Sequence, residues 1–195
     1  MSVLFERLSE KHLSWTDAFH CGETEEQLAK YTSSVRRRIK KHSKEMDDFL
    51  KNEAFSEQEL GTSTTYLLID DVEKRILAYV SLCSDAIRLE VEERDEAGIT
   101  YSSAPALKIA RLAVSTNDAG QGRGKFLIEF AASEALTIRA HAGVFFLTLD
   151  CYEHRESFYE KIGFKRNLIQ PVVLSYDSPI SMRIGLDEYL KRITE

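Results

Sequence analysis

The stretch from Leu112 to Ala142, LAVSTNDAGQGRGKFLIEFAASEALTIRAHA, constrains the fold more than any other part of the chain. It begins as an apolar strand end, passes through a polar turn and then has glycines at positions 120, 122 and 124. A strand, a glycine turn and a helix N-terminus form an anion site, because glycine lets the backbone approach closely and the first helical amides are unpaired. The helix is predicted from apolar residues spaced by three or four, which share one face: Leu127, Ala131, Ala135, Ile138 and Ala142.

Two common nucleotide-binding glycine motifs do not fit this stretch. A Walker A loop needs Ser or Thr after its lysine, whereas Phe126 follows Lys125, and Ala119 stands where the first glycine belongs. A dinucleotide fingerprint needs a third glycine at the position of Lys125. What remains is a Gly-x-Gly pattern on a strand–helix joint, which is either an anion cradle or a tight turn that binds no ligand.

Composition and charge restrict the class of protein. The 195 residues suffice for one α/β domain, and 43% hydrophobic with 30% charged residues is typical of soluble globular chains. A net charge of −6 argues against a general nucleic-acid binder. The charged first residues and the lack of a long apolar run predict a cytoplasmic protein with no signal peptide and no membrane partner. The three cysteines and five histidines lack metal-site spacing, so no metal is predicted.

The remaining chain alternates strand and helix patterns, and its middle strands read as an antiparallel meander, so a doubly wound parallel sheet is excluded. The predicted strands cover residues 3–7, 64–69, 75–83 with an extension at 87–91, 106–114, 144–149, 164–166 and 180–184. The predicted helices are a short one capped by Ser14 or Thr16 and ending by Phe19, a helical region from Thr24 to Leu60 that Gly61 stops, one at 153–161 closed by Gly163, and a terminal one at 186–193. Residues 94–103 are predicted to be a loop, and 171–179 irregular.

Two segments resemble the motifs of the GNAT acyltransferases. Ala119 to Gly124, after the Leu-x-Val strand end, resembles motif A, Arg/Gln-x-x-Gly-x-Gly/Ala, with Ala119 replacing the first residue. Phe158 to Phe164, FYEKIGF, resembles motif B, Phe-Tyr-x-x-x-Gly-Phe, although Tyr152 and Arg155 stand where the family often has Asn and Ala. The resemblance extends over residues 62–164, and the chain is identified as a member of this family.

The resemblance implies a fold, a donor and a site. The fold is α/β, with a GNAT-like mixed, mostly antiparallel central sheet flanked by helices. One domain of residues 1–195 is expected, with an N-terminal strand and helices at 1–61, a core with both motifs at 62–166, and a C-terminal strand and helix at 167–195. Acetyl-CoA is the expected co-substrate, with its pyrophosphate on the glycine turn and its arm paired with the preceding strand. The cofactor-binding residues are then Leu112, Ala113, Val114, Ala119, Gly120, Gln121, Gly122, Arg123, Gly124 and Lys125.

The implied chemistry is transfer of an acetyl group from acetyl-CoA to a primary amine. Tyr159 matches the family tyrosine that protonates the leaving sulfur, and its alternative role is a packing residue beside Phe158. No residue is named as the general base, although Glu90 and Asp150 carry carboxylates. The expected partner is a small-molecule or peptide amine, and a homodimer is compatible with the sequence.

Two other functions stay open. Phe19-x-Cys21-Gly22, together with the MDDFL segment at 46–50, is similar to a GNAT branch that includes toxins acetylating the amino acid on aminoacyl-tRNA. The basic run from Arg36 to Lys44 is either a solvated helix face, which we favour, or a contact for a polyanion such as tRNA or the 3′-phosphate of coenzyme A. The other alternative is a non-catalytic acyl-CoA sensor with a cradle and no acceptor site.

Overall fold

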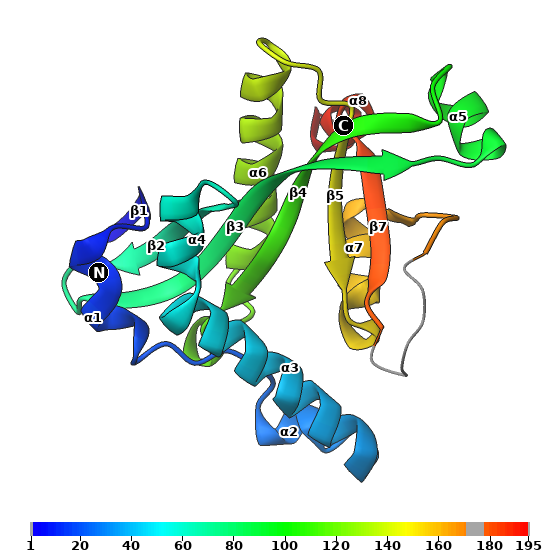
Figure 1. The fold of residues 1–195 in the computed structure, drawn as a ribbon. Coiled ribbons are helices and arrows are strands. Elements are labelled where there is room, and N and C mark those ends of the chain that lie inside the picture. The colour runs from blue at the N-terminus through cyan, green and yellow to red at the C-terminus, as the bar shows by residue number, and fades with distance from the viewer. Residues whose placement is uncertain (1, 171–177, 195) are drawn as a thin grey trace. The chain divides into compact units, whose positions relative to one another are not determined.

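A computed structural model of the chain describes residues 2–170 and 178–194. The chain divides into two compact units, the first formed by Met1–Cys83 and Ala110–Ile128 and the second by Ser84–Ile109 and Glu129–Glu195. Three elements run through both units: the strands β3 (Arg75–Arg88) and β4 (Ser103–Val114) and the helix α6 (Arg123–Arg139) (Figure 1).

The first unit contains an antiparallel arrangement in the order β1-β2-β3-β4. The strand β1 (Val3–Arg7) pairs along its whole length with residues 66–70 of β2 (Thr64–Asp70). β2 also pairs with the first half of β3, around a bulge between Leu68 and Ile69. The end of β4 adjoins β3, where the Ser115 amide donates to the carbonyl of Leu77 at 2.8 Å. The helical elements of this unit, besides the start of α6, are η1 (Glu10–His12), α1 (Leu13–Thr16), α2 (Glu25–Leu28), α3 (Ser33–Asn52), α4 (Ala54–Leu60) and η2 (Thr116–Asp118).

An aromatic cluster forms the core of the first unit. Tyr79 of β3 is completely buried, and its ring meets Phe19 at 5.5 Å and Phe49 of α3 at 6.1 Å between centroids. Its hydroxyl donates to the carbonyl of Met46 at 2.8 Å, so the buried polar atom has a partner. Leu67 of β2 belongs to the same cluster, which therefore attaches α3 to the strands.

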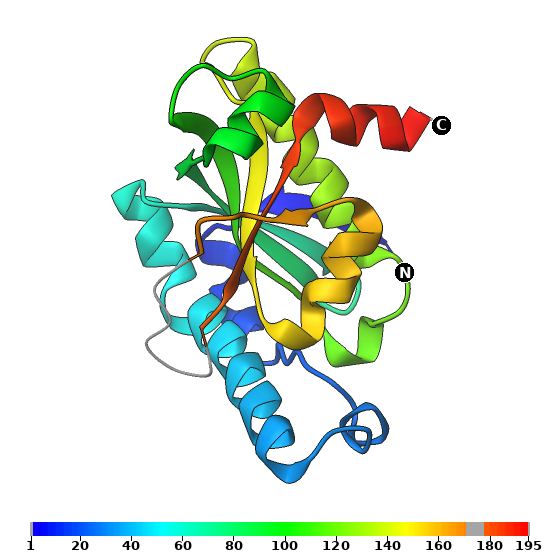
Figure 2. The same cartoon turned by 90° about the vertical axis from the view of Figure 1, so that its right-hand side faces the viewer.

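The second unit has the strand order β3-β4-β5-β7-β6. β5 (Phe146–Cys151) runs parallel to β4, from Ala106 opposite Phe146 to Ile109 opposite Leu149. β7 (Ile180–Gly185) is antiparallel to β5 and to the short β6 (Lys165–Arg166). Its other helical elements are α5 (Val91–Ala97), η3 (Glu153–Arg155), α7 (Glu156–Ile162) and α8 (Leu186–Thr194); Figure 2 shows η3 and α7 following directly from the end of β5.

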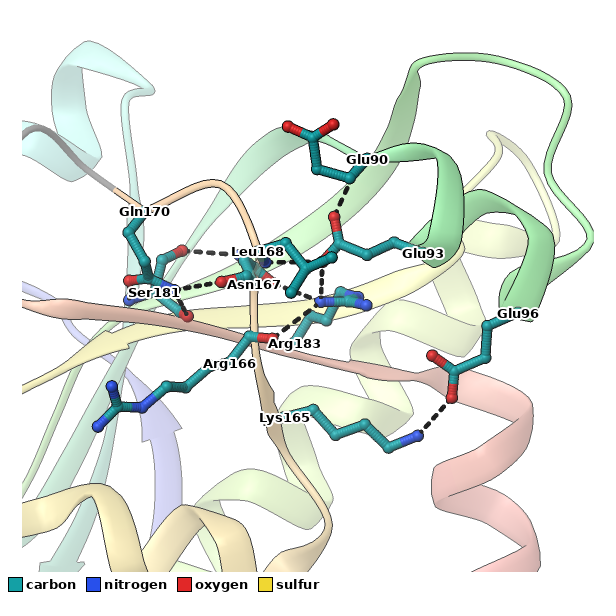
Figure 3. Close-up of polar contacts among 10 residues, drawn as sticks. All are labelled: Glu90, Glu93, Glu96, Lys165, Arg166, Asn167, Leu168, Gln170, Ser181 and Arg183. Atoms are coloured by element: carbon teal, nitrogen blue, oxygen red, sulfur yellow. Dashed lines mark hydrogen bonds and ion pairs between the residues drawn. The ribbon is translucent and has the colours of Figure 1, made fainter.

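A buried ion pair attaches α5 to the strands of the second unit. Glu93 of α5 is 3% exposed, and its Oε1 lies 2.5 Å from Nη1 of Arg183 on β7 (Figure 3). The same carboxylate accepts hydrogen bonds from the amides of Glu90 and Leu168, at 2.8 and 2.9 Å. Arg183 also donates to Oδ1 of Asn167 at 3.1 Å. Both buried charges are therefore paired and hydrogen-bonded, as burial requires.

The predicted architecture is confirmed, because the mixed sheet is mostly antiparallel and helices flank its strands. Three local predictions are wrong. Residues 94–103 are not all loop, since α5 extends to Ala97. The helical region from Thr24 to Leu60 is interrupted, with α2 ending at Leu28 and α3 starting after Thr32. The first helix ends at Thr16 rather than Phe19 and follows the 3-10 turn η1, whose N-cap is Ser9.

Other predictions need smaller corrections. Leu127, Ala131 and Ala135 are buried as expected, but Ile138 is 36% exposed and Ala142 lies beyond the end of α6. The segment predicted to be irregular, 171–179, falls mostly outside the described residues.

Within the described part of the chain, no helix is long and apolar enough to cross a membrane. Among the same residues, no group of three or more His, Cys, Asp or Glu side chains could hold a metal ion.

Candidate active site

The glycine turn joins the end of β4 to α6 through two left-handed residues. Gly120 and Gly122 have φ of 76° and 77°, a region that other L-residues enter only with strain. A Cβ atom built on either residue meets nothing within 4 Å, so the backbone conformation, and not lack of space, requires glycine here. Ala119, Gly120, Gln121 and Gly122 are exposed, which leaves the backbone of the turn accessible.

The first amides of α6 lie at this turn. The amide of Phe126 donates to the carbonyl of Gly122 at 3.0 Å and so makes the first intrahelical bond of α6. The amides of Arg123, Gly124 and Lys125 precede this bond and have no acceptor inside the helix. They lie at the positive end of the helix dipole, where an anion is stabilised. The Lys125 side chain is exposed at the same helix end and adds positive charge to it.

Arg123 behaves differently from the other predicted cofactor residues. Its side chain is 10% exposed, and its guanidinium forms an ion pair with Asp118, with Nη1 at 3.0 Å from Oδ1. The same Nη1 donates to the backbone carbonyl of Asp118 at 2.9 Å. Asp118 also binds Arg75, at 2.5 Å between Nη1 and Oδ2. The side chain of Arg123 is thus engaged inside the first unit, although its amide remains part of the helix start.

The strand before the turn is flanked by a segment from the N-terminal region. Leu112 and Val114 are half-buried, and Ala113 is buried in the core of the first unit. Cys21 forms an antiparallel bridge with Ser115 directly after β4. Next to this bridge, the amide of Thr116 donates to the carbonyl of His20 at 2.9 Å. The residues that follow Phe19 therefore pair with the residues that directly follow β4.

Asp47 of α3 holds this added segment. Its Oδ1 accepts the amide of Cys21 at 2.9 Å, and its Oδ2 lies 3.3 Å from Nδ1 of His20. Phe19, the residue before His20, is buried against Tyr79. The segment around Cys21 and the MDDFL segment at 46–50 thus meet in the first unit. Cys21 and Asp47 are 26 residues apart in the sequence, so no local pattern indicates their contact.

Tyr159 lies on α7 in the second unit. It is 9% exposed, and its ring packs edge-on against Phe158 at 5.0 Å and Phe164 at 5.9 Å. Gly163 ends α7 with φ of 114°, and the amide of Phe164 returns to the carbonyl of Tyr159 at 3.1 Å. Burial raises the pKa of Tyr159 and raises the pKa of the neighbouring Cys151 to about 12. Both groups therefore keep their protons at neutral pH.

The acidic residues on the strands of the second unit have partners. Asp150 of β5 forms an ion pair with Lys108 of β4, at 2.6 Å between Nζ and Oδ2. Asp85 of β3 accepts a hydrogen bond of 2.7 Å from the hydroxyl of the buried Thr148. These pairs join β3, β4 and β5, and they were missed in the sequence because each partner lies on a different strand.

Comparison with known proteins identifies the family. A sequence model described as an acetyltransferase (GNAT) domain matches residues 63–166, which is more than half of the chain and includes both motifs. Three solved structures share the fold at low identity. A bacterial toxin has a TM-score of 0.73 at 14% identity, covering 100% of this chain and 96% of that chain. A Tyr-to-Phe variant of KacT has 0.72 at 17%, covering 98% and 99% of the two chains.

The third structure is AtaT complexed with acetyl-methionyl-tRNAfMet, with a TM-score of 0.71 at 17% identity and full coverage of both chains. These identities support a common fold and no more. The match to the domain model, together with the mixed sheet and the glycine turn before α6, supports the assignment made from the two motifs. The chain therefore belongs to the GNAT family of N-acetyltransferases, which take the acetyl group from acetyl-CoA.

Proposed function

We propose that this protein transfers the acetyl group of acetyl-CoA to a primary amine and that the acceptor carries an α-amine. The observation that carries the proposal is the glycine turn, where two left-handed glycines directly precede the first amides of α6. The amides from Gln121 to Lys125 bind the pyrophosphate, whose negative charge suits the positive end of the helix dipole. The backbone from Leu112 to Val114 pairs with the pantetheine arm as an added strand would.

Tyr159 stabilises the leaving sulfur. The amine attacks the thioester carbonyl, the carbon–sulfur bond breaks, and negative charge develops on the sulfur. The raised pKa of Tyr159 keeps its proton available at every working pH. A phenol, with an ordinary pKa of about 10, is already a weaker acid than a thiol at about 8.5, and burial of Tyr159 increases this difference in pKa, so complete proton transfer to the sulfur is uphill. Tyr159 therefore acts mainly by donating a hydrogen bond to the developing thiolate, and water protonates the thiolate afterwards.

The argument for an α-amine comes from proton chemistry. Deprotonating a lysine-like amine at pH 7 costs about 4.6 kcal/mol, against about 1 kcal/mol for an α-amine. Asp150, one of the carboxylates considered as a base, is engaged by Lys108. An enzyme that relies on water to remove the proton is better suited to the acceptor that is already partly neutral.

A charged tRNA is the second candidate acceptor, because its aminoacyl group also presents an α-amine. The full-length fold similarity to AtaT, which was solved with acetyl-methionyl-tRNAfMet, favours it. The basic run on α3 gives it less support. Lys40 pairs with Glu25 at 2.7 Å, Lys41 with Glu45 at 3.6 Å and Lys44 with Asp48 at 2.5 Å, which offsets much of its positive charge.

An acceptor screen tests the proposal. Release of coenzyme A thiol from acetyl-CoA is measured with free amino acids, polyamines, peptides with a free N-terminus and aminoacylated tRNA, with deacylated tRNA as the control. We expect turnover with an α-amine acceptor and little with a polyamine. Efficient turnover of polyamines alone would refute the α-amine assignment. Binding of acetyl-CoA without turnover of any acceptor would instead identify an acyl-CoA sensor.

A further inference from the structure

A buried carboxylate joins the two ends of the glycine turn. Asp118 is the last residue of η2 and is 3% exposed, and Arg123 is the first residue of α6. Nη1 of Arg123 contacts both Oδ1 of Asp118, at 3.0 Å, and its backbone carbonyl, at 2.9 Å. Residues 119–122, including both left-handed glycines, lie between these two ends. The side chain of Arg123 therefore spans the glycine turn and links its last residue to Asp118 at its start.

Arg75 connects this closure to the sheet. It stands at the start of β3 and donates to Asp118 through Nη1, at 2.5 Å from Oδ2, and through Nη2, at 3.4 Å from Oδ1. Its Nη2 also lies 4.0 Å from Oδ2 of the buried Asp70, whose Oδ1 accepts the amides of Val72 and Glu73 in the turn between β2 and β3. The glycine turn is thereby fixed to a hairpin that lies 43 residues earlier in the chain.

The charges of this network predict opposite outcomes for two explanations of its role. Arg75 and Arg123 carry two positive charges, and Asp118 and Asp70 carry two negative charges, so the cluster is balanced. The Asp118 carboxylate stands directly before the turn and repels an anion bound there. If the network acted through its charge alone, neutralising Asp118 would strengthen anion binding. If it acts by holding the backbone of the turn, the same change would weaken binding, because glycine-rich backbone without restraint samples many conformations.

We propose that Asp118, acting through Arg123 and Arg75, is a positioning residue that holds the glycine turn in the conformation that binds the pyrophosphate of acetyl-CoA. The inference rests on the proposed function, because it assigns a role within the same cradle. It also gives Arg123 a role different from direct contact with phosphate, since its guanidinium contacts the carboxylate and the backbone carbonyl of Asp118.

The test compares Asp118→Asn and Asp118→Glu with the parent protein. Affinity for coenzyme A is measured by calorimetry at a temperature well below the melting point of each variant, and kcat and KM are measured with the best acceptor. We expect both variants to bind about tenfold more weakly or worse, because each loses the fit to two arginines. The KM for acetyl-CoA should rise by a similar factor, with kcat at saturation within about threefold of the parent value. Tighter binding by Asp118→Asn, or normal binding by Asp118→Glu, would mean that only charge matters.

A truncated donor separates positioning from general damage. Acetyl-pantetheine has the thioester and the arm but no pyrophosphate, so the variants should use it as well as the parent protein does. An equal loss of kcat/KM with both donors would overturn the proposal. Arg123→Met removes the closure while keeping the pair between Asp118 and Arg75, and it should reproduce the effect if Asp118→Asn does not fold.

Asp187→Asn is the matched control. It removes another aspartate–arginine pair that involves α6, between Asp187 of α8 and Arg139, the last residue of α6, at 2.7 and 3.2 Å. Its affinity for coenzyme A should equal that of the parent protein. If the parent protein itself binds neither coenzyme A nor acetyl-CoA, the proposed function fails. If the parent binds and Asp118→Asn binds equally well, only the role of Asp118 fails.

Discussion

Gly120 and Gly122 adopt nearly the same left-handed conformation two residues apart, with φ of 76° and 77°. A β-branched residue at either position forces the turn out of this conformation, at a cost of about 1–2 kcal/mol or more. We expect Gly122→Val to abolish the stabilisation by acetyl-CoA, which at 100 times the dissociation constant amounts to about 2.7 kcal/mol. Thermal melting with and without acetyl-CoA measures this.

Gly98→Val is the control for this experiment. Gly98 ends α5 with φ of 66° and has nothing within 4 Å of a built Cβ atom, so the backbone strain of the substitution is comparable. This variant should melt earlier than the parent protein and still respond fully to acetyl-CoA. A Gly122→Val variant that keeps the full response would remove the glycine turn from the cofactor site.

Two neighbouring arginines on α3 should respond differently to substitution. Arg36 donates to the carbonyls of Tyr31 and Ala29, at 2.8 and 3.1 Å, and so supplies hydrogen bonds to carbonyl groups that follow α2. Arg36→Gln should therefore lower the free energy of unfolding by about 1–2 kcal/mol. Arg37 is exposed, and Arg37→Gln should leave stability unchanged. Chemical denaturation of both variants measures the difference.

The same pair tests the tRNA alternative. Each phosphate contact that is lost flattens the dependence of log affinity on log salt by about 0.7 to 0.9. We expect tRNA binding to be weak and nonspecific, and Arg37→Gln to leave the salt slope unchanged. A flatter slope in Arg37→Gln, together with acetylation of charged tRNA by the parent protein, would contradict this expectation and make α3 a tRNA contact.

Local patterns predicted the elements whose apolar residues face a core. The strand from Thr64 to Ile69 was predicted from its β-branched and aromatic residues, and the buried face of α6 from the spacing of its apolar residues. Leu67 and Leu127 are completely buried, as these patterns predict. α5 was missed because its main buried residue is a charged one, Glu93. Its capping box and its final Gly98 were available signals. Its attachment depends on Arg183, 90 positions away in the sequence and invisible to any local pattern.

In the candidate site, too, local patterns could be predicted from the sequence and contacts between distant residues could not. The glycine turn and Tyr159 were identified because family motifs are contiguous in sequence. The partners of Asp118 were not, since Arg75 is on a different strand and the interaction depends on tertiary packing. The break between α2 and α3 was also missed, although Thr32 is the N-cap of α3 and the Thr-Ser-Ser segment at 32–34 was an available signal for a helix start.

Stability should fall at alkaline pH. Burial raises the pKa of Cys151 and of Tyr189 to about 12 and raises the pKa of Tyr159. In the unfolded chain these groups lose their protons near their ordinary values, about 8.5 for a thiol and about 10 for a phenol. Because the folded pKa values are the higher ones, the stability that these groups contribute is complete below pH 8.5 and is lost between about pH 9 and 12.

Urea denaturation from pH 8 to 11 checks this expectation. Cys151→Ala should lower stability at pH 8, because it removes buried volume, and should make the fall at higher pH less steep. Tyr101→Phe is the control, since Tyr101 is 77% exposed, and it should leave the steepness unchanged. A parent protein whose stability is flat up to pH 11 would show that these groups are not buried in solution as they are in the structure.

The mechanism is tested most directly by Tyr159→Phe. The phenyl ring keeps the edge-on contacts with Phe158 and Phe164, so stability at neutral pH should change little. The hydroxyl that we propose to donate to the leaving sulfur is lost, and we expect kcat to fall about ten- to a thousandfold, around or below the usual effect of a lost acid–base group. The effect is limited because a thiolate is a fair leaving group without help. Affinity for acetyl-CoA should change only modestly, because the proposed pyrophosphate site is formed by other residues. Tyr189→Phe is the matched control, since Tyr189 is a second buried tyrosine with a raised pKa, on α8, and it should keep the parent kcat. If Tyr159→Phe is as active as Tyr189→Phe on the same acceptor, Tyr159 is a packing residue and the developing thiolate is stabilised by water or by another side chain.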